Sequence, residues 1–571
     1  MSSARGHVDA HSTRWIAAIL GIIIALLVLP PVWYLFQGSL FEITPTGAVG
    51  EFTFEHYRRL LEGERLATSA VNSFVFAIGS AVVALLFGGV LAWIVERTNA
   101  PFKVLAYLTT IISLGTPYVL YVTAWLFLLG KVGPVNDLYR WLTGANDVLI
   151  NVHSMTGMVL VEGMLWSPLV FLLLSATLRT SNPEFEEAAR MSGASVWDTI
   201  RRITIRLALP AVMALVLLVF IRAFEGFEVP ALVGLPGRVN VLTTDIFLAL
   251  KDTVPPDAGR ASAFSVVLLC VVAVLLAFYN RISKSAERFH TVTGKGFRAR
   301  PFDLGAGRWI AGVIIIANFL FVLVLPNLVL LWASVLPFFQ AVRWKAVGLF
   351  TLENYKAVIN SPFYLELVWN TLILAAASAT IVMVLTLVVG WLAVRRKPGG
   401  WLLDQMATMP LIFPGIVLGT AVMQIYLAVP IPIYGTIWII LIAYVIRYLP
   451  YGMRYGYSGM LQIHRELEEA AGMSGAGNLV ILRRIVLPLL APAVASGWLF
   501  IFLLASRVLS LPILLAGPDS QTIAVAMYDM WTNGQGTELA AMGLLWTLIM
   551  TVIASGFYFL SRRSGAGVYG N

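Results

Sequence analysis

Six charged side chains lie inside long apolar stretches of this sequence, where a charge is costly unless it faces protein or water. They are Glu162, Arg222, Glu225, Glu228, Arg447 and Arg507. Two interpretations fit these residues: they mark span ends and pair structurally, or they line a polar path through a membrane. The carboxylates would suit a hard metal cation, but they would suit an organic cation equally well.

Other kinds of chemistry find little support. The six histidines are dispersed, and none has the spacing of a metal site such as HExxH. The run Gly294-Lys295-Gly296 lacks the upstream glycine and the Ser or Thr of a phosphate-binding loop. The one cysteine, Cys270, excludes a disulfide framework and a thiolate cluster. We therefore predict no catalytic residue, no metal site and no cofactor in this chain, so its energy must come from another polypeptide or from an ion gradient.

A polar, charged stretch interrupts the apolar runs twice. It reads EFEEAARMSGASVWDTIRRITIRLALP from Glu184 and ELEEAAGMSGAGNLVILRRIVLP from Glu466. We call these stretches EAA loop one and EAA loop two. They align at a spacing of 282 residues, as Glu187 with Glu469 shows. Two copies in register in one polypeptide indicate an internal repeat.

Each EAA loop predicts two short helices joined at a glycine with positive φ, which is Gly193 in the first copy and Gly475 in the second. The alanine pairs Ala188-Ala189 and Ala470-Ala471 favour a helix that presses closely into a groove on a partner. The alternative is an amphipathic surface helix that merely joins two spans. Because the stretch occurs twice in register, we favour the interpretation that each helix docks into a partner.

The pattern EAA, three residues, Gly, nine residues, I-x-L-P resembles the cytoplasmic loop of the membrane-spanning subunits of binding-protein-dependent ABC importers. EAA loop two fills it completely, with Glu469, Ala470, Ala471, Gly475, Ile485, Leu487 and Pro488. EAA loop one matches at Glu187, Ala188, Ala189, Gly193 and Ile203. It departs at Ile205, which replaces Leu, and at Arg206, which replaces Pro. The resemblance implies that each loop couples the permease to one of two ATPase subunits, which bind ATP and Mg, and that the second helices of the loops differ.

Composition requires a polytopic membrane protein, because 59% of the 571 residues are hydrophobic, 12% are charged and the mean hydropathy is +0.84. The net charge of +9 is scattered between apolar runs without interleaved aromatics, which argues against nucleic acid. Twelve runs are long enough to cross a bilayer. They lie near 15–36, 68–95, 104–129, 155–178, 207–233, 261–280, 309–335, 366–394, 402–428, 436–460, 489–515 and 541–560.

The runs form two sets of six that correspond beyond the EAA loops. At a spacing of 298 residues, Asn72, Trp93 and Arg97 recur as Asn370, Trp391 and Arg395. Because each set has an even number of spans, the repeats are parallel. We predict an all-α membrane protein of about 12 transmembrane helices, in two parallel six-helix repeats with an EAA loop each. Its expected divisions are a tail (1–14), a first repeat (15–280), a basic linker (281–308), a second repeat (309–563) and a C-terminal tail (564–571).

Orientation follows from the basic residues. With the N-terminus in the cytoplasm, the inside segments hold more than twice as many of the 39 Lys and Arg residues as the outside loops do. The positive-inside rule therefore places both EAA loops and both termini on the cytoplasmic side of a bacterial inner membrane. At the 282-residue spacing Arg507 corresponds to Glu225. We therefore predict that these two opposite charges face the interface between the halves, near the outer end of the path, and interact directly or through water in at least one state.

Three classes of function remain. An ABC importer permease accounts for two docking loops, an ion-coupled secondary transporter has no use for them, and a membrane enzyme would need a polar catalytic cluster. The fused halves, the run FEGFEVPALVGLPG with Thr243-Thr244, and the stretch from Arg507 through LPILLAGP to Met530-Trp531-Thr532-Asn533-Gly534 are similar to the ferric-iron permeases. Thiamine, polyamine and aminophosphonate permeases are close relatives. The resemblance implies two copies of a cytoplasmic ABC ATPase, a periplasmic or lipid-anchored binding protein and the lipid bilayer as partners.

Overall fold

The computed structural model describes residues 2–43, 49–180, 184–287, 302–429 and 431–563. The described chain is almost entirely helical; its one sheet pairs β1 (Phe41–Ile43) with β2 (Val49–Phe52). Within these residues ten helices are long and apolar enough to cross a membrane, and the number rises to twelve if each of two bent helix pairs counts as one span. The predicted all-α membrane fold with about 12 spans is confirmed.

The first repeat runs from α1 to α13. Its helices are α1 (Ser2–Leu40), α2 (Glu55–Glu62), α3 (Glu64–Ala84), α4 (Val90–Arg97), α5 (Lys103–Gly115), α6 (Tyr118–Leu129), α7 (Pro134–Thr143), α8 (Met155–Thr180), α9 (Glu184–Met191), α10 (Val196–Thr199), α11 (Ile205–Phe224), α12 (Leu242–Lys251) and α13 (Ala258–Glu287). Because α1 begins at Ser2, the stretch predicted as a separate tail continues the first span as a helix. The middle of the predicted linker, from residue 288 to 301, and the predicted C-terminal tail lie outside the described residues.

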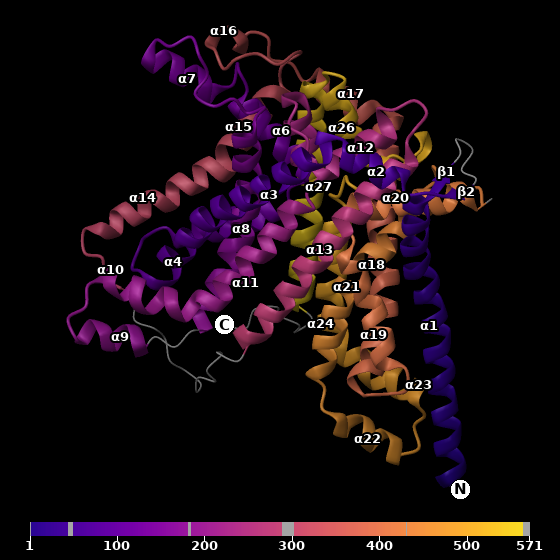
Figure 1. The fold of residues 1–571 in the computed structure, drawn as a ribbon. Helices are drawn as coiled ribbons and strands as arrows, with labels where there is room; N and C mark the ends of the chain where they lie inside the picture. The colour runs from indigo at the N-terminus through magenta and orange to yellow at the C-terminus, as the bar shows by residue number, and fades with distance from the viewer. Residues whose placement is uncertain (1, 44–48, 181–183, 288–301, 430, 564–571) are drawn as a thin grey trace.

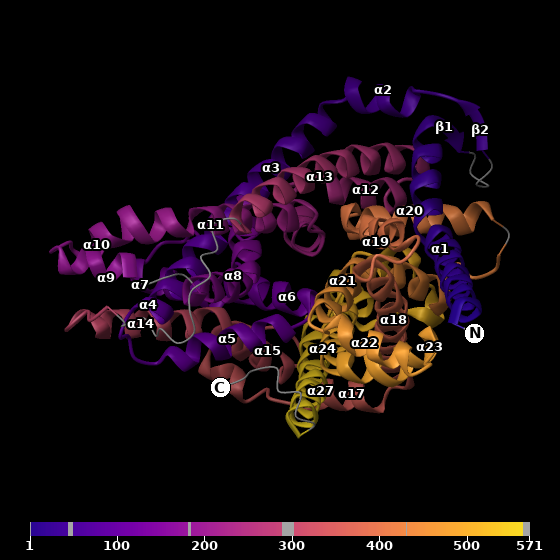
Figure 2. The ribbon, with the colours of Figure 1, turned by 90° about the horizontal axis from the view of Figure 1, so that it is seen from below.

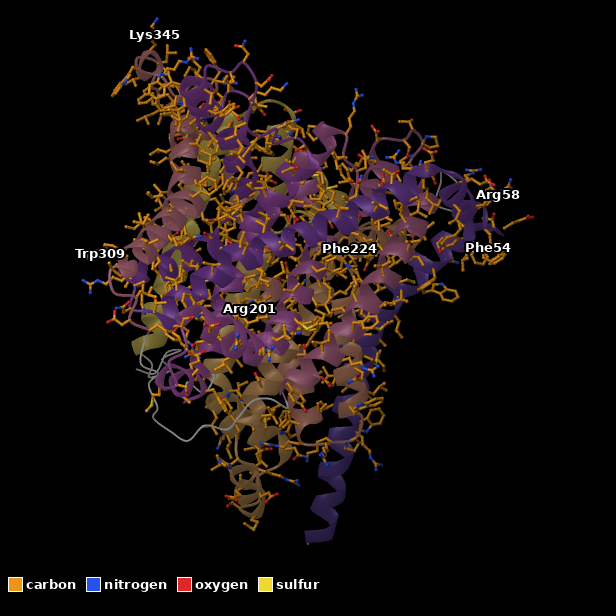
Figure 3. All side chains as sticks on the ribbon, turned by 60° about the vertical axis from the view of Figure 1, so that its left-hand side comes forward. Phe54, Arg58, Arg201, Phe224, Trp309 and Lys345 are labelled. Atoms are coloured by element: carbon orange, nitrogen blue, oxygen red, sulfur yellow. The ribbon has the colours of Figure 1, made fainter. Side chains whose placement is uncertain are left out.

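The second repeat repeats this order. Its helices are α14 (Gly307–Phe319), α15 (Leu325–Ser334), α16 (Trp344–Val347), α17 (Glu353–Asn360), α18 (Pro362–Val394), α19 (Gly400–Thr408), α20 (Gly415–Ala428), α21 (Ile437–Leu461), α22 (Arg465–Met473), α23 (Asn478–Ile481), α24 (Leu487–Ala505), α25 (Pro512–Leu515), α26 (Ile523–Thr532) and α27 (Gly536–Arg563). In Figure 1 the EAA helices α9 and α22 lie on the lower side, where α1 also begins. Figure 3 labels Lys345 at the top and Arg58 at the upper right, and it labels Arg201, in EAA loop one, below both of them near mid-height.

The first span of each repeat packs against the other repeat. Helix α1 lies on α19 and α20 as well as on α13 of its own repeat, while α14 and α15 lie on α5 and α6. Figure 2 shows this exchange from below: α1 runs beside the second repeat, and α14 and α15 run beside the first. One face of each first span is therefore packed on the opposite half, while most of the apolar surface of both spans lies on the outside of the protein, as expected for helices that face lipid.

Several predicted spans are broken. The third, 104–129, is two helices separated at Thr116-Pro117, and the ninth bends by 107° between Gly400–Ile412 and Gly415–Ala428. Proline explains both breaks, since it lacks the N–H that would continue the helix. The predicted fifth span ends early, at Phe224, and the eleventh ends at Ala505. The short helices α12 and α26, which follow them at equivalent places, were not predicted.

Glycines set how closely the two central helices of the second repeat approach. A Cβ atom on Gly456 of α21 would lie 2.8 Å from the Thr386 carbonyl oxygen of α18, and one on Gly390 would lie 3.1 Å from the Gly456 carbonyl carbon. Real Cβ atoms do not sit at the first distance. Small residues allow such backbone contact between membrane helices, which pack by close fit rather than by a hydrophobic driving force.

Candidate functional site

EAA loop one has the predicted form of two short helices with a glycine hinge. Helix α9 ends before Gly193, which has a φ of +85°, and α10 follows. The Ala194 N–H closes the end of α9 on the Ala189 carbonyl at 3.0 Å, as helix ends with a left-handed glycine do. A five-residue π-helical turn, Ile200–Thr204, then leads directly into α11. The side chain of Glu187 lies outside the described part of the structure.

EAA loop two has the same construction. Gly475 has a φ of +86° between α22 and α23, and a second π-helical turn, Leu482–Val486, leads into α24. The two π-helical turns are 282 residues apart, so they belong to the repeat. Ala470 is exposed, as is Ala188, and Ala471 is half-buried, as is Ala189. Glu469 is exposed and pairs with Arg465 of its own helix at 2.8 Å.

A buried ion pair ties each EAA helix to the end of the second span. In the first repeat Arg97 Nε lies 3.4 Å from Glu186 Oε2, and in the second Arg395 Nη2 lies 2.6 Å from Glu468 Oε1. All four side chains are about nine-tenths buried or more. Removal of one partner would leave a buried charge unpaired, so these contacts hold the EAA helices firmly.

The partners of these two carboxylates differ between the repeats. Glu186 also accepts a hydrogen bond from the Thr204 hydroxyl at 2.8 Å, whereas Glu468 accepts one from Trp391 Nε1 at 3.0 Å. Sequence reasoning treated the two arginines only as repeat landmarks and missed both glutamates. The sequence did offer a signal for this pair. Arg97 recurs as Arg395 at the 298-residue spacing, and Glu186 recurs as Glu468 at the 282-residue spacing.

The predicted intramembrane charges gather where the two repeats meet. Glu225 forms an ion pair with Arg222 of its own repeat and lies 3.6 Å from Arg447 of the second repeat. Arg222 donates a hydrogen bond to the Tyr451 hydroxyl at 2.8 Å, again across the repeats. Glu225 and the two arginines are largely buried. This group joins the halves by charge-assisted contacts at membrane depth.

Two further cross-repeat contacts extend the cluster. The Arg507 guanidinium lies 4.5 Å from the ring centroid of Tyr118, and Glu228 Oε1 accepts the Leu509 N–H at 3.3 Å. Glu162 stays within the first repeat, where it is buried and accepts a hydrogen bond from Trp166 Nε1 at 2.8 Å. Five of the six predicted charges therefore contact the other repeat directly or through Glu225.

Broken helices bring these side chains to the interface. Glu225 and Glu228 follow the end of α11, and Arg507 follows the end of α24. Non-helical backbone is tolerated at membrane depth only where protein or water satisfies its polar groups. Glu225 and Arg507 both lie at the interface between the halves, and Glu225 forms ion pairs with Arg222 and Arg447. Among the described residues, no group of three or more His, Cys, Asp or Glu side chains could hold a metal ion.

Comparison with known proteins agrees with this duplicated architecture. Residues 88–288 and, separately, residues 383–564 match the family described as "Binding-protein-dependent transport system inner membrane component". The chain belongs to this family. The match to two segments confirms both the permease family and the fused repeats, and it makes the chain a multi-pass inner-membrane transport subunit.

Individual relatives fall into two groups. The permease is 25% identical over 528 residues to the ferric transport system permease protein FbpB of Actinobacillus pleuropneumoniae, which covers 90% of this chain and 75% of that protein. It is 25% identical over 488 residues to a putative ferric transport system permease protein, FbpB 1, of Haemophilus influenzae, covering 83% and 74%. It is also 24% identical over 266 residues to the spermidine/putrescine transport system permease protein PotC of Escherichia coli, covering 46% of this chain and 98% of that protein.

Proposed function

We propose that this permease carries ferric iron, delivered by a periplasmic binding protein, into the cytoplasm as part of an ABC importer. The choice of ferric iron as the substrate rests on the similarity to a ferric permease over 90% of the chain, which includes both repeats. The similarity to a spermidine/putrescine permease covers 46%, which corresponds to one repeat. A fused pair of repeats therefore favours iron.

ATP hydrolysis would come from two copies of a separate ABC ATPase, one on each EAA loop. The position of α9 and α22 on one side of the molecule supports this arrangement (Figure 1). The half-buried Ala189 and Ala471 leave room for close approach by a partner. In this proposal the EAA loops and the chain termini are cytoplasmic, and the permease itself binds neither ATP nor Mg.

The path for the substrate would run between the repeats. The cross-repeat contacts of Arg222, Glu225, Arg447 and Arg507 support this proposal, since any opening of the interface has to separate them. The cluster would act as a closed constriction in the present state, and Glu162 and Glu228 would lie beside it. An importer must release its cargo, so tight binding belongs to the binding protein and the path itself binds weakly.

Uptake of labelled ferric iron tests the substrate. We expect cells that have lost all other iron importers to lose iron uptake when this chain is deleted, and to regain it when the chain is restored. The matched control is restoration with Ala471→Trp, which should insert in the membrane without restoring uptake. Unchanged iron uptake after deletion would overturn the ferric assignment.

A polyamine is the second candidate, because of the spermidine/putrescine permease among the relatives and because carboxylates line the interface. The same deletion strain should take up labelled spermidine at the wild-type rate if iron is the substrate. Loss of spermidine uptake with normal iron uptake would replace the first candidate with the second. Either result leaves the permease assignment intact.

A further inference from the structure

A short segment just before the second repeat docks on the end of the second span of the first repeat. We call Phe302–Leu304 the clamp segment. The Phe302 N–H donates to the Arg97 carbonyl at 2.7 Å, and the Asn99 N–H donates to the Phe302 carbonyl at 3.1 Å, which makes a parallel bridge. The Asn99 side chain adds two bonds: Nδ2 donates to Asp303 at 2.6 Å, and Oδ1 accepts the Leu304 N–H at 3.1 Å.

The clamp segment is also packed. Phe302 is 3% exposed, and its ring centroid lies 6.3 Å from that of Trp93. Trp93 corresponds to Trp391, whose Nε1 binds Glu468 of EAA loop two. In the first repeat, by contrast, Trp93 Nε1 has no hydrogen-bond partner among the described residues. Trp93 therefore supports the clamp segment instead of binding an EAA carboxylate.

Arg97 joins the clamp segment to EAA loop one. Its carbonyl accepts the Phe302 N–H, while its guanidinium pairs with Glu186. A displacement of α9 therefore acts, through one residue, on the segment that leads into α14. That helix in turn packs on α4 and α5 of the first repeat.

The second repeat lacks this arrangement in the described part of the chain. The described residues form two isolated bridges, one between Thr98 and Phe302 and one between Gly435 and Ala516. Neither of them involves the end of α18. Lys397 occupies the place of Asn99 and lies over the Trp391 ring at 5.6 Å. Beside it is a surface pocket of about 490 Å³ lined by residues that include Arg396, Lys397 and Asp404.

We propose that the clamp segment is a positioning element for EAA loop one, and that it links this loop to the first span of the second repeat. The two loops are then tied to the opposite half in different ways. Loop one is tied through Arg97 by a backbone hydrogen bond from the clamp segment, whereas loop two is reached by apolar side chains of α1, which share one buried cluster with Ile481. The inference rests on the proposed function where it concerns transmission of ATPase movement. The clamp itself concerns only this chain.

Hydrogen exchange on the full chain in lipid nanodiscs tests the clamp without any partner. Asn99→Ala removes two hydrogen bonds to the clamp segment, so we expect exchange in α9 to rise about tenfold, with no change in α22. Phe302→Ala should have the same effect. Lys397→Ala is the matched control at the equivalent position, and it should change exchange in neither helix.

Hydrolysis by the assembled complex tests transmission. With ATPase and loaded binding protein added, we expect Asn99→Ala to lower the ratio of stimulated to basal ATP hydrolysis several-fold and to leave the basal rate unchanged. Unchanged exchange in α9 for both Asn99→Ala and Phe302→Ala would overturn the proposal, as would an equal rise in α9 and α22, which indicates general loosening. If Asn99→Ala exchanges faster in α9 but keeps the wild-type ratio of stimulated to basal ATP hydrolysis, the proposed role in transmission is overturned. If the wild-type complex shows no stimulation, the proposed function fails, and exchange alone decides for or against the clamp.

Discussion

Replacing Arg395 with Gln removes the guanidinium that holds EAA loop two. Arg395 places Nε 2.7 Å and Nη2 2.6 Å from Glu468 Oε1, and Nη2 also donates to the Ile463 carbonyl at 2.9 Å. After the change, Glu468 keeps the bond from Trp391, but its side chain is only 11% exposed. Loss of one partner of a buried pair destabilises by about 3–5 kcal/mol. Because Trp391 remains, we expect the lower end, about 3 kcal/mol, for the free energy that keeps α22 docked.

That free energy corresponds to about a 100-fold rise in the opening equilibrium of α22, since 1.4 kcal/mol is tenfold. Hydrogen exchange measures it directly, because amide exchange of a locally opening helix scales with its open population. The control is Arg465→Gln in the same helix. Its pair with Glu469 has side chains 72% and 58% exposed, so its loss should change exchange by no more than about fivefold.

A second variant separates the ion pair from general damage. In Arg395→Gln with Glu468→Gln no charge is left buried, so exchange in α22 should fall back toward the wild-type rate. The reasoning is wrong if Arg395→Gln exchanges no faster in α22 than Arg465→Gln does. It is also wrong if the double variant exchanges faster than Arg395→Gln alone.

Three further outcomes follow from the structure. Ala189→Trp or Ala471→Trp should abolish substrate-stimulated ATP hydrolysis in the reconstituted complex while the chain still inserts in membranes; wild-type stimulation in both would count against docking. Glu225→Gln should impair uptake more than the same change combined with Arg447→Gln, since the single change leaves two buried arginines, Arg222 and Arg447, without their carboxylate and the double change leaves only Arg222; a double variant no better than the single would argue against the pair of Glu225 with Arg447. Gly456→Leu should lower thermal stability in detergent by roughly 1–3 kcal/mol through overpacking against α18, and an unchanged unfolding temperature would contradict the close contact.

Much of the fold could be predicted because it depends on local composition. Long apolar runs identify the spans, and the constant spacing between copies identifies the repeats and the EAA glycines. The breaks could not be located in this way. The segment around Pro117 is as apolar as the helices beside it, and Glu225 and Glu228 are followed at once by the apolar run Pro230–Gly234, so composition alone does not show where the chain turns.

The contacts of the site depend on distant residues, which explains the other misses. Arg97 and Glu186 are far apart in the chain, and no local pattern pairs them. Likewise, the repeat relation between Glu225 and Arg507 identifies positions that are symmetric about an axis, and symmetric positions need not touch. The arginine beside Glu225 across the interface, Arg447, comes from a different span, which only the packed structure reveals.

The π-helical turns that follow the two EAA loops restrict the number of residues in these segments as well as their sequence. Each lies in a nearly continuous helical rod of about 40 Å, from α10 through α11 or from α23 through α24. A π-helical turn holds one residue more than an α-helical turn. Deleting one residue from Ile200–Thr204 would restore a regular helix and swing everything on the loop side by about 100° around the rod axis. Since Leu482–Val486 carries the same extra residue, a deletion in one half alone would aim the two loops in different directions. Substitutions in these turns should therefore be accepted far more readily than changes of one residue in their length.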